Sequence, residues 1–131
     1  MITEELSLRR DTFSVKTMRV PGNKLHLQMD GCADLRVQND IAVLLDRIHK
    51  EARNTSVTTV IVNMENLEFL NSGCFKCLCS WVRWMLGGPR SYVVTIISSP
   101  KHHWQTRSLS ALRQLAPDLI SVEVVSNPPP V

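Results

Sequence analysis

The order of the predicted elements indicates an α/β domain, a small mixed sheet packed by helices with an antiparallel hairpin at its start. Three observations predict this class. Segments 12–20 and 24–30 are strand-like and meet at a tight turn. Two later segments, 59–62 and 91–97, are apolar runs without helical spacing. Segments with helical periodicity lie between and after them, and such alternation favours a sheet with right-handed crossovers.

Composition is that of one ordinary globular domain. The 131 residues are 44% hydrophobic and 21% charged, which is enough to build a core without disulfides or metal. The net charge of +3 and the lack of a basic run argue against nucleic-acid binding. No apolar stretch reaches membrane-spanning length and no signal core is seen, so we expect a cytoplasmic protein. We expect an extension over 1–11, the domain over 12–126 and a Pro-rich tail over 127–131.

The first two strands read as a hairpin. Segment 12–20 is rich in β-forming residues, and Pro21-Gly22 fits the centre of a type II turn. Segment 24–30 alternates, with Leu25, Leu27 and Met29 on one side. We therefore expect one face of this hairpin to be in water.

A helix is predicted next, over about 35–52. Asp34 precedes it as a candidate cap. Apolar residues recur at three- and four-residue steps, which predicts an amphipathic helix with one buried side: Ile41, Leu44, Leu45, Ile48 and Ala52.

The apolar run 59–62 predicts a strand that is covered on both faces, and 91–97 is a second strand of this kind. Ser99-Pro100 is a helix-start signal, and the helix that follows should run to about Ala116. A last strand is expected over 120–125, near an edge of the sheet because Glu123 interrupts its apolar pattern.

The central helix follows Asn71-Ser72-Gly73. Its apolar positions from Phe75 to Leu86 form one stripe, and Gly87-Gly88-Pro89 ends it. Asn71 and Ser72 are both good N-cap residues, and the sequence does not decide between them. A hydroxyl at this end lies in the positive end of the helix dipole, where a negative group is favoured by roughly 0.3–1 kcal/mol. Ser72 is therefore suited to carry a phosphate, or it only caps the helix.

The run VIVNMENLEFLNSGCFKCL resembles the signature of STAS domains, the family of anti-sigma-factor antagonists and related modules. Their pattern is an apolar strand, a polar loop, an apolar pair, then Asp-Ser-Ser-Gly and a helix. The element order extends the resemblance over about 12–126. Asn71 stands where the family usually has Asp, Gly73 where it has the second Ser, and Cys74 where it has Gly.

The resemblance implies a function as well as a fold. In the family the first serine of the motif is reversibly phosphorylated, and it falls on Ser72. The unmodified domain docks onto an anti-sigma factor or a related serine kinase, and a phosphatase reverses the modification. The resemblance thus implies a cytoplasmic, non-enzymatic module of signal transduction and transcription regulation, without a cofactor; a homodimer is compatible with it.

Seven residues are candidates for the docking surface. Trp81 and Trp84 extend a second stripe on the central helix that also includes Cys74 and Cys77, and Trp is frequent in binding hot spots. The alternative is that neighbouring elements bury the two rings. The candidates are Asn71, Ser72, Gly73, Lys76, Cys77, Trp81 and Trp84.

Two other functions remain open. The domain could be a constitutive subunit of a larger assembly, such as a stress-signalling complex or a transporter accessory. A thiol or metal site on Cys74 and Cys77 is a remote alternative, because no second ligand cluster follows and a base could come only from His102 or His103 in space. The non-functional alternative for the cysteines, including Cys79, is that they are small packed hydrophobic residues in a reducing compartment.

Overall fold

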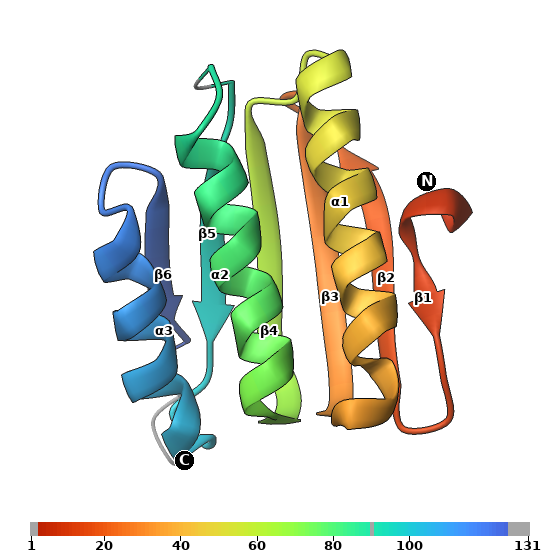
Figure 1. The fold of residues 1–131 in the computed structure, drawn as a ribbon, viewed down its shortest axis with the longest axis vertical. Helices are drawn as coiled ribbons and strands as arrows, with labels where there is room; N and C mark the ends of the chain where they lie inside the picture. Colours follow the sequence, from red (N-terminus) through yellow and green to blue (C-terminus); the bar gives the residue numbers. More distant parts are fainter. Residues whose placement is uncertain (1–2, 90, 126–131) are drawn as a thin grey trace, which may run out of the picture.

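The computed structural model describes residues 3–89 and 91–125, which form one six-stranded sheet with three helices (Figure 1). Strand order follows the sequence, β1-β2-β3-β4-β5-β6. The strands are β1 Leu8–Arg9, β2 Phe13–Val20, β3 Lys24–Ala33, β4 Thr59–Leu70, β5 Val93–Ser98 and β6 Ile120–Val124. The α-helices are α1 Gln38–Asn54, α2 Ser72–Leu86 and α3 His103–Leu115, and 3-10 turns span η1 Glu4–Leu6 and η2 Leu35–Val37.

The sheet is mixed, as the sequence predicted. β1, β2 and β3 are antiparallel, whereas β3 to β6 are parallel and joined through the helices. The hairpin turn has three residues between the paired Val20 and Lys24. Gly22 has φ 89, as the expected turn requires, and Asn23 has φ 59, which Asn tolerates better than most residues.

The N-terminal segment 3–9 packs onto the domain. β1 pairs with the outer edge of β2, and Leu6 of η1 is buried in the core. Residues 1–11 have little periodicity, so this short strand was not predicted. The tail predicted over 127–131 lies outside the described residues.

All three helices lie on the same face of the sheet (Figure 1). Accordingly, burial alternates along β4: Val60 and Val62 are fully buried, whereas Ile61 and Asn63 are partly exposed. The prediction that the apolar strands are covered on both faces is therefore wrong for the described residues. Each parallel strand adds to the same edge of the sheet, and crossovers of one hand then place every helix on one side.

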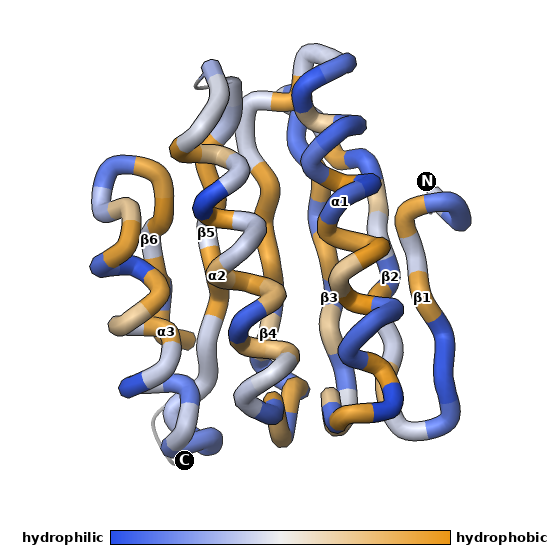
Figure 2. The backbone as a smooth tube through the Cα atoms, viewed as in Figure 1, coloured by the Kyte–Doolittle hydropathy of each residue, from blue (hydrophilic) through white to orange (hydrophobic). Residues whose placement is uncertain are grey.

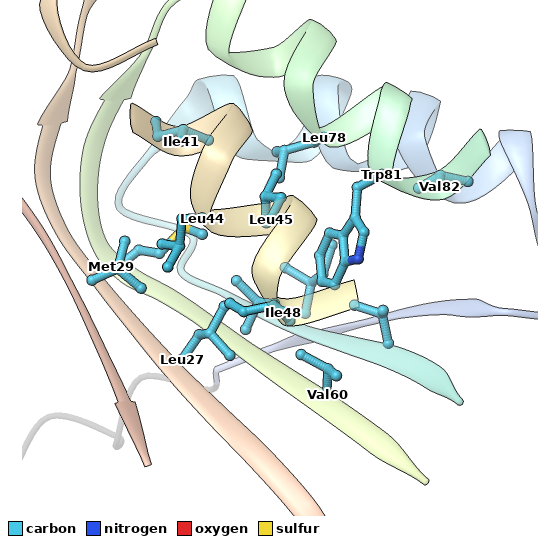
Figure 3. Packing of buried hydrophobic residues seen from close by; sticks show 14 of the residues in the cluster. Leu27, Met29, Ile41, Leu44, Leu45, Ile48, Val60, Leu78, Trp81 and Val82 are labelled. Atoms are coloured by element: carbon cyan, nitrogen blue, oxygen red, sulfur yellow. The ribbon is translucent and has the colours of Figure 1, made fainter. Parts of the chain in front are cut away.

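The core fills the space between this sheet face and the helices. Figure 2 shows hydrophobic and hydrophilic residues alternating along α1, as expected of an amphipathic helix. In Figure 3, Leu44, Ile48, Leu78 and Trp81 of the helices lie over buried side chains of β3 and β4. No helix in the described ranges has both the length and the apolarity that a membrane crossing needs.

β4 is longer than its neighbour β5. Pairing with β5 ends at Asn63–Ile97, whereas β4 continues to Leu70 along β3 with two register shifts. Beyond Asn63, β4 has no partner on the side of β5. Side chains from the start of α3 form hydrogen bonds with its backbone there. His102 Nε2 lies 2.9 Å from the carbonyl oxygen of Glu65, and Trp104 Nε1 donates to that of Glu68 at 2.9 Å.

Gln105 is the buried member of this group. Its Nε2 donates to the carbonyl oxygens of Met64 at 2.7 Å and Leu67 at 3.1 Å. Its Oε1 accepts from the backbone N–H of Ser99 at 2.9 Å. The signal Ser99-Pro100 thus begins a turn, and α3 starts later, at His103, where its side chains can reach β4.

A mutation of Gln105 tests whether its side-chain hydrogen bonds replace those that a neighbouring strand would make to β4. Gln105→Ala leaves two carbonyl groups and one N–H group unpaired in the interior, so we expect the free energy of unfolding to fall by about 2–4 kcal/mol. Gln114→Ala, an exposed position on α3, is the matched control and should change it by less than about 0.5 kcal/mol. Urea unfolding measures both; equal effects of the two variants would contradict the role of Gln105.

Candidate functional site

The start of α2 is capped by Asn71. Its Oδ1 accepts from the backbone N–H of Cys74 at 2.7 Å, and its backbone is extended, with φ −74 and ψ 167. Its own N–H donates to the carbonyl oxygen of Ala33 at 2.9 Å, which ties the helix start to the end of β3. The choice that the sequence left open is thereby decided: Asn71 caps, and Ser72 is the first helical residue.

Ser72 is free of a capping role and exposed. Its hydroxyl has no hydrogen-bond partner among the described residues. The first turn of α2 contains no acidic side chain, and Lys76 is exposed one turn further along the same side of the helix. The helix dipole and Lys76 therefore both favour a negative group on this exposed oxygen.

Two exposed apolar side chains belong to segments that meet the start of α2. Leu35 is 74% exposed and Phe69 is 48% exposed. Phe69 precedes Ser72 by three residues at the end of β4, and Leu35 follows Asp34, whose carbonyl oxygen lies 3.5 Å from Cys74 Sγ. We call this region the Ser72 surface and define it by Leu35, Phe69, Ser72, Lys76 and Cys77. The sequence analysis did not name Leu35 and Phe69 as candidates for the docking surface. The available signal was that both are apolar but fall outside the stripes that predict the core.

A shallow groove continues this surface between α1 and α2. Its volume is about 250 Å³, and it is lined by Leu35, Gln38, Asn39, Ala42 and Cys77. The side-chain amide of Gln38 lies where a Cβ on Gly73 would be. Gly73 therefore lets the start of α1 approach the first turn of α2 closely.

The cysteines are packed groups. Cys74 is fully buried with its Sγ 3.5 Å from the carbonyl oxygen of Asp34, and Cys77 Sγ lies 3.6 Å from that of Gln38. Burial, and secondarily the neighbouring Cys77 and Asp34, raises the pKa of the Cys74 thiol to about 11. Burial also raises the pKa of Cys77. Both thiols are thus poor nucleophiles at neutral pH.

The described residues contain no group of three or more His, Cys, Asp or Glu side chains placed to hold a metal ion. His102, one of the two histidines that could have supplied a base, is bonded through Nε2 to the backbone of β4 instead. The geometry therefore gives the thiol hypothesis no support from His102.

The two tryptophans of α2 have different surroundings. Trp81 is 1% exposed and donates through Nε1 to the hydroxyl of Tyr92 at 2.9 Å. Its assignment to the docking surface is therefore wrong, because the ring lies in the core with Ile48 of α1 and bonds to Tyr92, the residue before β5 (Figure 3). Trp84 is 37% exposed, but it is twelve residues from Ser72, about 18 Å along the helix. It lies outside the Ser72 surface.

Thiol labelling tests the packing of Cys74. With its pKa near 11 and its side chain buried, Cys74 should react with iodoacetamide at pH 8 at least about 100-fold more slowly in the folded chain than in urea. Peptide mapping by mass spectrometry measures the rate for each cysteine. A folded rate close to that of the denatured chain would show a reactive thiol and reopen the thiol hypothesis.

Comparisons with known proteins agree with this geometry at the level of fold. No protein-family model matches the sequence, and no curated protein matches it.

Among solved structures, a chain in the crystal structure of the diguanylate cyclase SiaD in complex with its activator SiaC from Pseudomonas aeruginosa matches with TM-score 0.65 and 9% identity. The match covers 91% of this chain and 98% of that one. The anti-sigma factor antagonist SpoIIAA in its unphosphorylated form matches with TM-score 0.52 and 16% identity, over 83% of this chain and 87% of that one. The chain has the fold of the STAS-domain proteins SpoIIAA and SiaC, as the motif around Ser72 predicted.

Proposed function

We propose that this chain is a non-enzymatic signalling module whose Ser72 surface binds a regulatory protein and is switched by phosphorylation of Ser72. One observation carries the proposal: the first residue of α2 has an exposed hydroxyl without a hydrogen-bond partner, at the end of the sheet where Leu35 and Phe69 are also exposed. Exposed apolar side chains around a modifiable polar group suit a reversible protein contact.

The switch follows from charge. A phosphate adds about −1.5 to −2 charges and three acceptor oxygens. In the free domain the start of α2 and the exposed Lys76 stabilise this charge. In a complex the same charge would be buried against apolar Leu35 and Phe69, so its desolvation would weaken docking.

The partner that we propose is an anti-sigma factor or a related serine kinase, with a phosphatase that removes the phosphate. Support comes from the fold shared with SpoIIAA, an anti-sigma factor antagonist, and from Ser72 at the place where the family resemblance puts the phosphorylated serine. The proposed output is transcription regulation. All four cysteines are free, which suits the reducing cytoplasm.

A constitutive subunit of a larger assembly is the second candidate. Two observations favour it: Trp84 stays partly exposed away from Ser72, and the SiaC match comes from a complex of an enzyme with its activator. In that case Ser72 would remain unmodified when the chain is incubated with ATP and its native serine kinase, as mapped by mass spectrometry.

Binding of the native partner kinase tests the switch. Ser72→Asp should raise the dissociation constant about ten-fold or more, whereas Ser72→Ala should leave it within about two-fold, because only the first adds charge. Ser110→Asp adds the same charge at an exposed position of α3 and is the matched control. Isothermal titration measures all three, and equal affinities of the two Ser72 variants would rule out the switch.

The apolar flank makes a separate prediction. Leu35→Ala and Phe69→Ala should each weaken partner binding by about five-fold or more while changing the free energy of unfolding by less than about 0.5 kcal/mol, since both side chains are exposed. Leu115→Ala, an exposed leucine on α3, should change neither. Unchanged binding by the first two variants would place the partner elsewhere on the molecule.

A further inference from the structure

A second hollow lies at the other end of α2. It has a volume of about 430 Å³, within the range of small-molecule sites. The second half of α1, the last turn of α2 and the two glycines after it supply its walls. It is lined by Asp46, His49, Arg53, Arg83, Trp84, Gly87 and Gly88.

His49 forms the buried part of this lining. It is 9% exposed, and its Nδ1 lies 2.6 Å from the hydroxyl of Tyr92. That hydroxyl already accepts from Trp81 Nε1, so its own hydrogen is available for Nδ1. In the tautomer in which Tyr92 donates to Nδ1, the imidazole proton is on Nε2, which has no hydrogen-bond partner among the described residues. None of the described side-chain nitrogen or oxygen atoms is both fully buried and unpartnered, so Nε2 is open to solvent and free to donate to a ligand.

Burial, and secondarily the charge of Arg53, lowers the pKa of His49. The ring is thus neutral at neutral pH and offers one donor, while its other nitrogen is held by Tyr92. Because Trp81 in turn holds Tyr92, the donor is fixed in place before any ligand arrives.

Two unpaired positive charges accompany this donor. Arg53 and Arg83 make no ion pair within the described ranges. The Nη1 atom of Arg53 lies 3.7 Å from the position of a Cβ on Gly88, so its guanidinium is beside the glycine wall. The one acid in the lining, Asp46, is paired with Lys50 at 3.0 Å. The hollow thus has an excess of positive charge.

Trp84 adds a flat apolar wall. Its ring centroid is 6.1 Å from that of His49 at an angle of 45°, and 37% of the residue is exposed. An indole face of this kind stacks on unsaturated rings and interacts with nearby guanidinium groups.

We propose that this hollow binds an aromatic phosphate ester, with the phosphate on Arg53, Arg83 and His49 Nε2 and the ring against Trp84. Arginines near helix C-termini also serve to complement the helix dipole. That role alone would not place an unpartnered imidazole nitrogen in the lining of the same hollow. The site is independent of Ser72 and of the proposed docking function.

Phenyl phosphate and inorganic phosphate are the probes. In an NMR titration of the isotopically labelled full chain, both should shift signals of His49 and of residues 83–88, and phenyl phosphate should bind more tightly. Arg53→Gln and Arg83→Gln should each raise the dissociation constant for both probes by about five-fold or more. Arg47→Gln, which removes an exposed charge of α1 outside the lining, is the matched control and should change it by less than about two-fold.

Trp84→Leu separates the two halves of the site, since it should abolish the preference for phenyl phosphate and leave inorganic phosphate binding unchanged. The proposal is overturned if neither probe shifts these signals at millimolar concentration. It is also overturned if Arg47→Gln weakens binding as much as the two lining variants, because a diffuse positive surface would then explain the result. A preference for phenyl phosphate that persists in Trp84→Leu would refute the ring site.

Discussion

The backbone of β4 beyond its last contact with β5 is the constraint on which the candidate site depends. The carbonyl groups of this segment cannot remain unpaired inside the protein. Gln105, His102 and Trp104 bond to them from α3 in place of a strand. This support keeps β4 extended to Leu70, where Asn71 bonds to β3 and caps α2. The position of Ser72 thus depends on residues more than thirty positions later in the chain.

The two ends of α2 differ in chemistry. Its first turn has an exposed hydroxyl without a hydrogen-bond partner and one buried thiol, and exposed apolar side chains belong to the segments that meet it, which suits a protein contact. Its last turn adjoins guanidinium groups and a hydrogen-bonded core of His49, Tyr92 and Trp81, which suits a small anion. Between them the helix packs on the sheet through its apolar stripe. One rigid element therefore positions two distinct surfaces.

Periodicity predicted most of the fold. The alternation in β3 and the apolar stripes of α1 and α2 depend on local spacing, and the structure has these elements there. Three expectations depended on distant partners instead. Coverage of β4 on both faces was wrong because the helices all lie on one side, Trp81 proved to be a core residue, and α3 began at His103. None of these is encoded in a short window of sequence.

The sequence predicted the candidate site in part, as it did the fold. The motif marked Asn71 and Ser72, and the structure shows which of them caps α2. Leu35 could not be placed near the start of α2 without the parallel register of β3 and β4. Likewise, nothing in the sequence joins Arg53 of α1 to Arg83 of α2, because their proximity follows from how the two helices pack.

The central claim is that a regulatory partner docks on the Ser72 surface. Hydrogen–deuterium exchange of the chain alone and in complex with its native serine kinase tests it most directly. The account predicts that binding slows exchange in the amides of residues 69–77 and of η2, and that phosphorylation of Ser72 removes this protection. Protection confined to β6 or to the uncovered face of the sheet, with residues 69–77 unchanged, would contradict it.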